Sequence, residues 1–166
     1  MLDFARQGMN GYVETVQYYE LERAQWHSED EFLYPEVKKC LKHLSAKYKI
    51  GIIANQQLGT QERLEKMGIA KYISLVISSA DEGIAKPNLQ MFYFALERAE
   101  CTAENAVMIG DRIDNDIVPA KAVGMCTVWI KQGFGGMAVP RGEAETADYI
   151  VNNIDEIHKI FMEETQ

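Results

Sequence analysis

Residues 107–116 of the chain read VMIGDRIDND, and this stretch decides the fold class that the sequence predicts. Its apolar beginning favours a buried strand that ends near Ile109, and the Gly-Asp pair that follows is typical of a turn into a helix. We expect that helix over about 115–123, because Gly124 is a common type of helix terminator. A buried strand that leads at once into a helix is the unit of a parallel α/β sheet.

The same alternation of strands and helices extends through most of the chain. The predicted elements are a helix that starts at Pro35, a strand over 50–54, a helix capped by Thr60 that ends at Gly68, a strand over 73–77, a helix that contains Phe92 and Ala99, strands over 126–130 and 149–151, and a final helix that contains Ile154 and Phe161. The strand segments are apolar on both faces, which indicates a sheet covered on both sides. We therefore predict an α/β fold with a Rossmann-like parallel sheet.

Composition and charge exclude several classes of function. The 166 residues suit a single domain, and 17 basic against 25 acidic residues leave a net charge of -8. This charge disfavours nucleic acid as a partner, and no apolar run reaches the length that a bilayer requires. The three widely spaced cysteines suit buried thiols in a reducing compartment. We expect a cytoplasmic protein with no nucleic-acid partner and no membrane partner.

Polar side chains gather where the predicted strands end. Asn55 and Gln56 follow one strand, and Lys86 follows another. Asp111 and Asp116 lie on the turn after a third strand. In parallel sheets of this kind, ligands bind at the carboxyl ends of the strands. Two carboxylates on one turn suit a hard cation such as Mg²⁺, and a nearby lysine can neutralise a phosphate or a carboxylate.

In order and spacing, these segments resemble the haloacid dehalogenase superfamily over about residues 33–160. Three stretches carry the resemblance: Tyr34 to Asn55 is similar to the second motif region of the family, 83–87 (GIAKP) to its lysine motif, and 107–116 to its acidic metal motif. The resemblance implies a parallel sheet of the haloacid dehalogenase type. Compared with the family pattern, the helical cap is incomplete and the central nucleophile strand is missing.

The resemblance divides the chain into two parts. Residues 1–32 are interpreted as the helical remnant of a cap, and residues 33–166 as the α/β core. In the family, the cap closes over the substrate and carries much of the specificity. Apolar side chains that have lost their partners in such a remnant would favour a homo-oligomer.

Most members of the superfamily are Mg²⁺-dependent phosphatases that act through an aspartyl-phosphate. Carried over by motif, the resemblance makes Asp111 a magnesium ligand and Asp116 a ligand or a supporting carboxylate. It assigns catalysis to Lys86 and Asn55, and it places Asn55, Gln56 and Lys86 against the substrate. The implied cofactor is Mg²⁺, and the implied partner is a small phosphorylated metabolite.

The sequence departs from the family at the most reactive position of the site. The family's nucleophile is the first aspartate of an Asp-x-Asp pair after an N-terminal strand, and no such pair precedes the cap-like segment. The Asp-x-Asp that is present, Asp114 to Asp116, belongs to the metal motif. Ala54 also stands where the family places a serine or threonine that hydrogen-bonds the phosphoryl group. We therefore expect this chain alone to be inactive.

The missing nucleophile strand lies in the centre of the family's sheet, between the strands that we expect to end at Asn55 and Gly110. Three arrangements are open. The two flanking strands pair directly, a segment of residues 1–20 is recruited, or another chain supplies a strand by edge pairing. A buried strand contributes several apolar side chains at about 1.5 to 3 kcal/mol each, so its loss requires compensation.

Two functions follow from these features. The first is a phosphatase-type hydrolase of a small phosphorylated metabolite, which keeps Lys86, Asp111 and Asp116 and receives its nucleophile from residues outside this chain. The second is a non-catalytic module that binds Mg²⁺ or phosphate, or that regulates another protein. Both functions use the same residues.

Other patterns in the chain indicate simpler roles. The segment from Gly133 to Ala138 formally fits the G-x-G-x-x-A pattern of dinucleotide sites. Pro140 and Gly142 prevent the helix that such a site needs, so we expect a flexible surface loop. The three histidines share no metal-ligand spacing, and we predict none of them to be a metal ligand.

Overall fold

The computed structural model describes residues 31–162, so most of the predicted helical cap remnant, residues 1–32, lies outside the described residues. The α-helices are α2 (Val37–Leu44), α3 (Thr60–Lys66), α4 (Ser79–Glu82), α5 (Gln90–Ala99), α6 (Val118–Ala122) and α7 (Ile154–Met162). The strands are β1 (Gly51–Ala54), β2 (Leu75–Ser78), β3 (Val107–Gly110), β4 (Cys126–Ile130) and β5 (Tyr149–Val151). Short helical turns are η2 (Ala70–Tyr72), η3 (Ala103–Asn105), η4 (Ile113–Ile117), η5 (Gly135–Met137) and η6 (Glu143–Glu145).

All described strand pairs are parallel, which confirms the predicted fold class. β1 pairs with β2, and Ile53 lies opposite Ile77. β3 pairs with β4, and β4 pairs with β5 on its other side. Helices connect successive strands, as a parallel sheet requires. The result is a mixed α/β fold with a Rossmann-like alternation of elements.

The strands form two sheets, β1-β2 and β3-β4-β5, and β1 does not pair with β3. Direct pairing of the two flanking strands, one of the three open arrangements, is therefore not what the described residues show, and recruitment of residues 1–20 lies outside the described residues. The two sheets are nevertheless held together by side chains. Phe92 of α5 belongs to the same core cluster as Ile77 of β2 and Met108 of β3. Because this packing spans both sheets, they share a core without a hydrogen bond between their facing edges.

β1 and β3, the strands on either side of the break between the two sheets, are less buried than β4, the central strand of the larger sheet. β1 contains no fully buried residue, and Met108 is the buried residue of β3, whereas four of the five residues of β4 are buried. Interior strands of a parallel sheet covered on both faces are normally apolar and buried. Ile52 and Ile53 of β1 are only half-buried. An additional strand at the break would therefore bury apolar surface on both of its neighbours.

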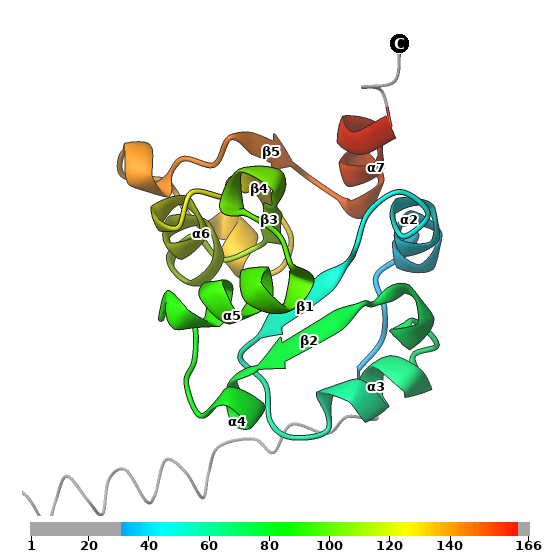
Figure 1. The fold of residues 1–166 in the computed structure, drawn as a ribbon. Coiled ribbons are helices and arrows are strands. Elements are labelled where there is room, and N and C mark those ends of the chain that lie inside the picture. The colour runs from blue at the N-terminus through cyan, green and yellow to red at the C-terminus, as the bar shows by residue number, and fades with distance from the viewer. Residues whose placement is uncertain (1–30, 163–166) are drawn as a thin grey trace, which may run out of the picture. The chain divides into compact units, whose positions relative to one another are not determined.

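Helices cover both faces of the strands. Met108 joins a cluster that includes residues of α5 and α6. Its neighbour Ile109 packs against a second cluster, formed by residues of α2, β4, β5 and α7. Since neighbouring side chains of a strand point to opposite faces, the two clusters lie on opposite sides of β3. Figure 1 shows α2 and α7 side by side, and α5 in front of β1 and β2.

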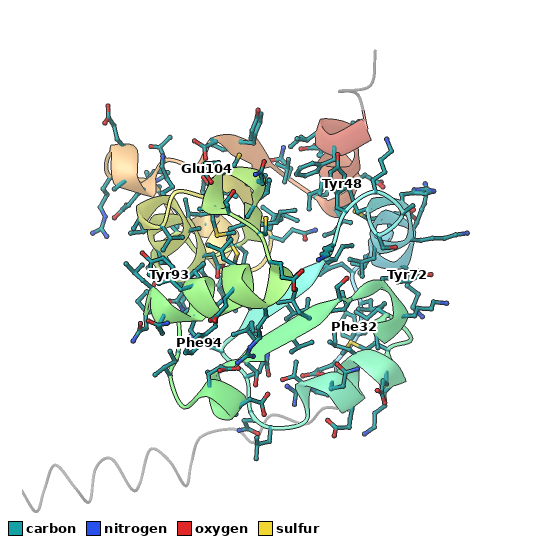
Figure 2. The ribbon with its side chains drawn as sticks, viewed as in Figure 1. Phe32, Tyr48, Tyr72, Tyr93, Phe94 and Glu104 are labelled. Carbon is teal, nitrogen blue, oxygen red and sulfur yellow. The ribbon has the colours of Figure 1, made fainter. Side chains whose placement is uncertain are left out.

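Tyr48, which is labelled in Figure 2, joins the segment after α2 to α7. Its ring lies 5.9 Å from that of Phe161, centroid to centroid, with an angle of 67° between the ring planes. Its hydroxyl group also donates a hydrogen bond of 3.5 Å to the carbonyl oxygen of Phe161. This edge-on aromatic contact packs the segment after α2 against α7.

Several element boundaries differ from the sequence predictions, and two of the differences have a clear local description. The strand expected over 73–77 begins two residues later, because residues 70–72 form the helical turn η2. Thr60 lies in the first turn of α3 and is not its cap, since the residue before it, Gly59, takes the cap position with a φ of 89°. The Thr60 hydroxyl instead donates to the carbonyl oxygen of Gln57.

Within residues 31–162, no helix combines the length and the apolar character that crossing a membrane requires. Cys40, Cys101 and Cys126 form no disulfide with one another. Burial, with a smaller contribution from the charge of Asp155, raises the pKa of the Cys40 thiol. This thiol is therefore protonated and unreactive at neutral pH.

Candidate functional site

The carboxyl ends of β1 and β3 meet the loop that follows α4. Asn55 comes directly after β1, Lys86 lies in the loop between α4 and α5, and Asp111 comes directly after β3. Hydrogen bonds and charge interactions connect these residues and Asp116. Four of the five predicted site residues are thus brought together, whereas the side chain of the fifth, Gln56, contacts other residues.

Lys86 and Asp116 form a nearly buried ion pair at the centre of this site. The Lys86 Nζ atom lies 2.6 Å from Asp116 Oδ1, and the two side chains are 11% and 6% exposed. Charged side chains are seldom buried to this degree unless they are paired, because burial removes their hydration. The pair therefore places one ammonium group in a fixed position at the ends of the strands.

A π-helical turn, η4, brings Asp116 back toward the end of β3. The backbone N–H groups of Asp116 and Ile117 both donate to the carbonyl oxygen of Arg112, at 2.8 and 3.3 Å. Asp116 Oδ2 in turn accepts a hydrogen bond of 3.0 Å from the Arg112 N–H. A Cβ atom on Gly110 would lie 2.5 Å from Asp116 Cγ, so the carboxyl group occupies the space of a missing side chain. π-Helical turns of this kind frequently occur at functional sites.

Asn55 holds the main chain of Lys86 from the neighbouring strand end. Its Nδ2 donates to the Lys86 carbonyl oxygen at 2.8 Å, and its Oδ1 accepts from the Lys86 N–H at 2.7 Å. The Lys86–Pro87 peptide bond beside it is cis. Because both polar atoms of the Asn55 amide are engaged in this way, the side chain orients the lysine loop.

Gln56 contacts different partners from the other predicted residues. Its Oε1 accepts a hydrogen bond of 3.0 Å from Arg63 Nη2. Its main-chain N–H and carbonyl oxygen both meet the Ser79 hydroxyl, at 3.0 and 3.1 Å. These contacts connect the loop after β1 to α3 and α4, and they turn the Gln56 side chain toward Arg63.

Asp111 is a second carboxylate of the site, and its surroundings disfavour its charged form. Burial, together with the negative charge of Asp116, raises its pKa. A backbone hydrogen bond at Asp111 and the charges of Lys86 and Arg112 act in the opposite direction and do not cancel the rise. Its backbone carbonyl oxygen accepts a hydrogen bond of 2.8 Å from Trp129 Nε1.

This donor set fits a hard divalent cation with Asp111 as the first protein ligand. A cation at the Asp111 carboxylate would favour the charged form, which burial and the charge of Asp116 disfavour. The two oxygens of Asp116 already accept hydrogen bonds from Lys86 and Arg112, which suits a supporting carboxylate. In the described part of the chain, no three acidic, histidine or cysteine side chains cluster as a metal site. The other ligands would be water, phosphoryl oxygens or a carboxylate from a further segment.

A cleft of about 490 Å³ opens beside the same turn. Arg112 and Asp114 form one part of its wall, and Phe134 and Gly135 form another. The predicted flexible surface loop is therefore a wall of the cleft, and its segment 135–137 forms the helical turn η5. No extended helix follows that loop, which agrees with the rejection of a dinucleotide site.

Sequence reasoning missed Gly110, Trp129 and Gly135, which lie around the two aspartates. The Gly-Asp pair was visible as a turn signal, but the need for a glycine comes from the return of Asp116 to that position. Trp129 lies in a buried strand and resembled a core residue. Gly135 belonged to a glycine-rich pattern, and its position against Asp111 depends on packing between distant segments.

Comparisons with known proteins point in one direction. Residues 5–130 match the sequence model of the haloacid dehalogenase-like hydrolases. A glyceraldehyde 3-phosphate phosphatase of Methanocaldococcus jannaschii is 38% identical over 127 residues, which are 75% of this chain and 54% of that protein. The pyrimidine 5'-nucleotidase YjjG of Escherichia coli is 32% identical over 128 residues, which are 76% of this chain and 56% of that protein.

Solved structures agree with these sequence matches. A phosphatase of Thermococcus onnurineus superposes with a TM-score of 0.69 and 28% identity, over 91% of this chain and 64% of that one. The Bacillus subtilis protein YfnB, whose structure holds magnesium, gives a TM-score of 0.72 over 81% of this chain and 58% of that one. At 23% identity, the latter supports the fold alone. The chain spans about half the length of the curated relatives that it matches.

Proposed function

The chain belongs to the haloacid dehalogenase-like hydrolase family, and we propose that it forms the lysine and magnesium half of a phosphatase site for small phosphorylated metabolites. The observation that carries the proposal is the buried Lys86–Asp116 pair, which stands beside Asp111 at the ends of strands from two different sheets. The relatives named above are phosphatases of small phosphorylated compounds, which supports the substrate class.

Each residue of the site has a distinct task in this proposal. Mg²⁺ held by Asp111 would stabilise charge that develops on the phosphoryl oxygens. Lys86 places its ammonium group beside the same oxygens, and Asp116 holds that group in position. Asn55 is a positioning residue, because both polar atoms of its amide hold the Lys86 main chain. Gln56 contacts the substrate only if its side chain leaves Arg63.

The attacking carboxylate is the part that this half-site lacks. We propose that it arrives on an extended strand that enters the break between β1 and β3 and pairs with both. The half-buried residues of β1 and the single buried residue of β3 support this placement, because a strand there would complete their burial. Such a strand ends beside Asn55 and Asp111, where the phosphoryl group would lie.

A non-catalytic binding module is the second candidate function. It is favoured by two observations in the sequence. No Asp-x-Asp pair precedes the lysine motif, and Ala54 cannot donate the hydrogen bond that a hydroxyl group would provide. In this case the half-site would bind Mg²⁺ and phosphate and would not turn a substrate over.

Binding and turnover measured together distinguish these functions. The first measurement is calorimetric titration of the 166-residue chain with inorganic phosphate, with and without Mg²⁺. We expect Mg²⁺-dependent binding that is lost in Asp111→Asn and in Lys86→Met, and we expect no turnover of phosphorylated metabolites. Asp114→Asn is the matched control, because Asp114 lies on the same turn with its side chain 65% exposed.

The second measurement adds the missing strand. A peptide with an apolar strand sequence that ends in Asp-x-Asp is mixed with the chain, and phosphate release is followed. Turnover that needs the first aspartate of the peptide and Asp111 supports the phosphatase. Phosphate binding with no turnover under any of these conditions supports the binding module. A chain that binds neither Mg²⁺ nor phosphate contradicts both functions.

We also propose a cytoplasmic location, because three cysteines with no disulfide among them suit a reducing compartment. A homo-oligomer stays a prediction that size measurement in solution can test. If a second copy supplies a strand at the break, the oligomer dissociates when the peptide described above is added.

A further inference from the structure

The loop after β4 lies directly against the proposed magnesium ligand. A Cβ atom built on Gly135 would lie 2.5 Å from the backbone oxygen of Asp111 and 2.6 Å from its Oδ2. Real Cβ atoms do not approach other heavy atoms so closely, so an alanine at this position would displace Asp111 or the loop. The absent side chain of Gly135 is therefore what allows the loop to touch both the peptide group and the carboxylate of Asp111.

Position 135 requires a glycine because there is no space for a side chain, and not because of its backbone conformation. Gly133, two residues earlier, has a φ of 58°, which favours glycine for conformational reasons. Gly135 does not have a positive φ. Any residue could adopt its backbone conformation if Asp111 were not there, so its requirement arises from contact with the site.

Trp129 also holds the peptide group of Asp111. Its Nε1 donates a hydrogen bond of 2.8 Å to the Asp111 carbonyl oxygen. The residue is 3% exposed and belongs to a core cluster with Ile113, Ile117 and Ala147. Because the indole ring is fixed by this packing, its N–H points at Asp111 from a rigid support.

We propose that Gly135 and Trp129 are positioning residues that hold the Asp111 carboxylate in the orientation required to bind a divalent cation. The inference rests on the proposed role of Asp111 as a metal ligand, and it extends that role to two residues on a different strand and loop. Outer residues that orient metal ligands commonly contribute a factor of about 10 to 100 in metal affinity.

The experiment measures Mn²⁺ affinity, with Mn²⁺ as a paramagnetic probe for the magnesium site, in the full chain. We expect Gly135→Ala to weaken Mn²⁺ binding about tenfold or more, and Trp129→Phe, which keeps a buried ring but loses the N–H donor, to weaken it by about the same factor. Circular dichroism and thermal unfolding of each variant establish that it is folded.

Two glycines of the same region provide matched controls. A Cβ atom on Gly136 would lie 2.8 Å from the Cα atom of Lys131, so Gly136→Ala strains the loop without touching Asp111. A Cβ atom on Gly142 would meet nothing within 4 Å. We expect Gly136→Ala to lower the thermal stability as much as Gly135→Ala does while Mn²⁺ affinity stays within twofold, on the order of experimental error. Gly142→Ala is expected to change neither.

The outcomes separate this inference from the proposed function. If the unaltered chain binds Mn²⁺ and both Gly135→Ala and Trp129→Phe bind it equally well, the positioning role is wrong and the metal site stands. If Gly136→Ala weakens binding as much as Gly135→Ala does, the loss reflects loop strain and the inference is also wrong. If the unaltered chain binds no Mn²⁺, the metal role of Asp111 fails, and the inference fails with it.

Discussion

Lys86 Nζ lies 2.6 Å from Asp116 Oδ1, and this ion pair joins two segments that follow strands of different sheets. Lys86 follows β2 in the smaller sheet, whereas Asp116 follows β3 in the larger one. The strands of the two sheets do not hydrogen-bond to each other across the break. The pair therefore acts as a polar connection at the carboxyl ends of the strands, where the site is formed.

Removing one partner of this pair is expected to destabilise the protein strongly. Asp116→Asn leaves the Lys86 ammonium buried without its counter-charge, and a loss of about 3 to 5 kcal/mol in the free energy of unfolding is typical of such a change. Urea denaturation measures it. The double variant with Lys86→Met recovers much of the loss, because no buried charge remains. Asp114→Asn, on the same turn but with an exposed side chain, changes stability little, and equal losses in the two aspartate variants would contradict a buried role for the pair.

Asn55 is expected to affect phosphate binding indirectly, because its side chain holds the main chain of Lys86. Asn55→Ala removes both bonds to the Lys86 main chain, so we expect severalfold weaker phosphate binding in calorimetry. The expected loss of stability is about 1 kcal/mol, the usual size for exposed hydrogen bonds. Gln57→Ala, two residues further along in an exposed position, is the control. Unchanged phosphate affinity in Asn55→Ala would show that the loop holds Lys86 without this side chain.

A side chain at position 110 is expected to disturb Asp116, because the two would compete for the same space. Gly110→Ala forces Asp116 away from the end of β3, because the new Cβ atom would overlap its carboxyl group. We expect a loss of about 1 to 3 kcal/mol in unfolding free energy, as for other overpacked positions, together with weaker Mg²⁺ binding. Thermal and calorimetric titrations measure both quantities. Gly142→Ala, where the surroundings are open, is expected to leave both unchanged.

The break between the sheets predicts an uneven pattern of amide hydrogen exchange. Among the strands that the structure describes, β4 has neighbours on both sides, whereas β1 and β3 each have one. Half of the amide groups of a parallel strand point to each side, so some groups of β1 and β3 have no strand partner. We expect mass-spectrometric exchange to be faster in β1 and β3 than in β4. Addition of the Asp-x-Asp peptide should slow it in both strands, and a peptide that changes neither strand would argue against insertion at the break.

Asp148 predicts a pH dependence of stability that is independent of the site. Hydrogen bonds from the Thr127 hydroxyl and N–H hold the pKa of the Asp148 carboxyl below its ordinary value of 3.8. A lowered folded-state pKa means that the carboxylate stabilises the fold above pH 3.8 and that this contribution is lost as the pH falls through the lowered value. Asp148→Asn should therefore be less stable than the unaltered chain at neutral pH, and the difference should shrink in acid. Urea denaturation across this range measures the difference, and a gap that stays constant with pH would contradict the assignment.

The sequence predicted the elements of the fold with good accuracy where the signals were local. β4 and β5 begin and end as expected, because each is an apolar run that turn residues delimit. The start of α3 was misplaced by one residue, since Thr60 and Gly59 are both acceptable cap residues and local patterns do not separate them. The π-helical form of the turn at Asp116 was also not predictable, because it depends on the return of that carboxylate to Gly110.

Sequence alone determined the order of strands and helices, the family, and the presence of Asn55, Lys86, Asp111 and Asp116 at strand ends, because turn residues and apolar spacing act over a few neighbouring positions. Tertiary structure decided that β1 and β3 stay apart, that Gln56 turns to Arg63, and that the loop at Gly135 rests on Asp111. These features depend on how segments many residues apart fill one volume, and a pattern of neighbouring residues does not contain that volume.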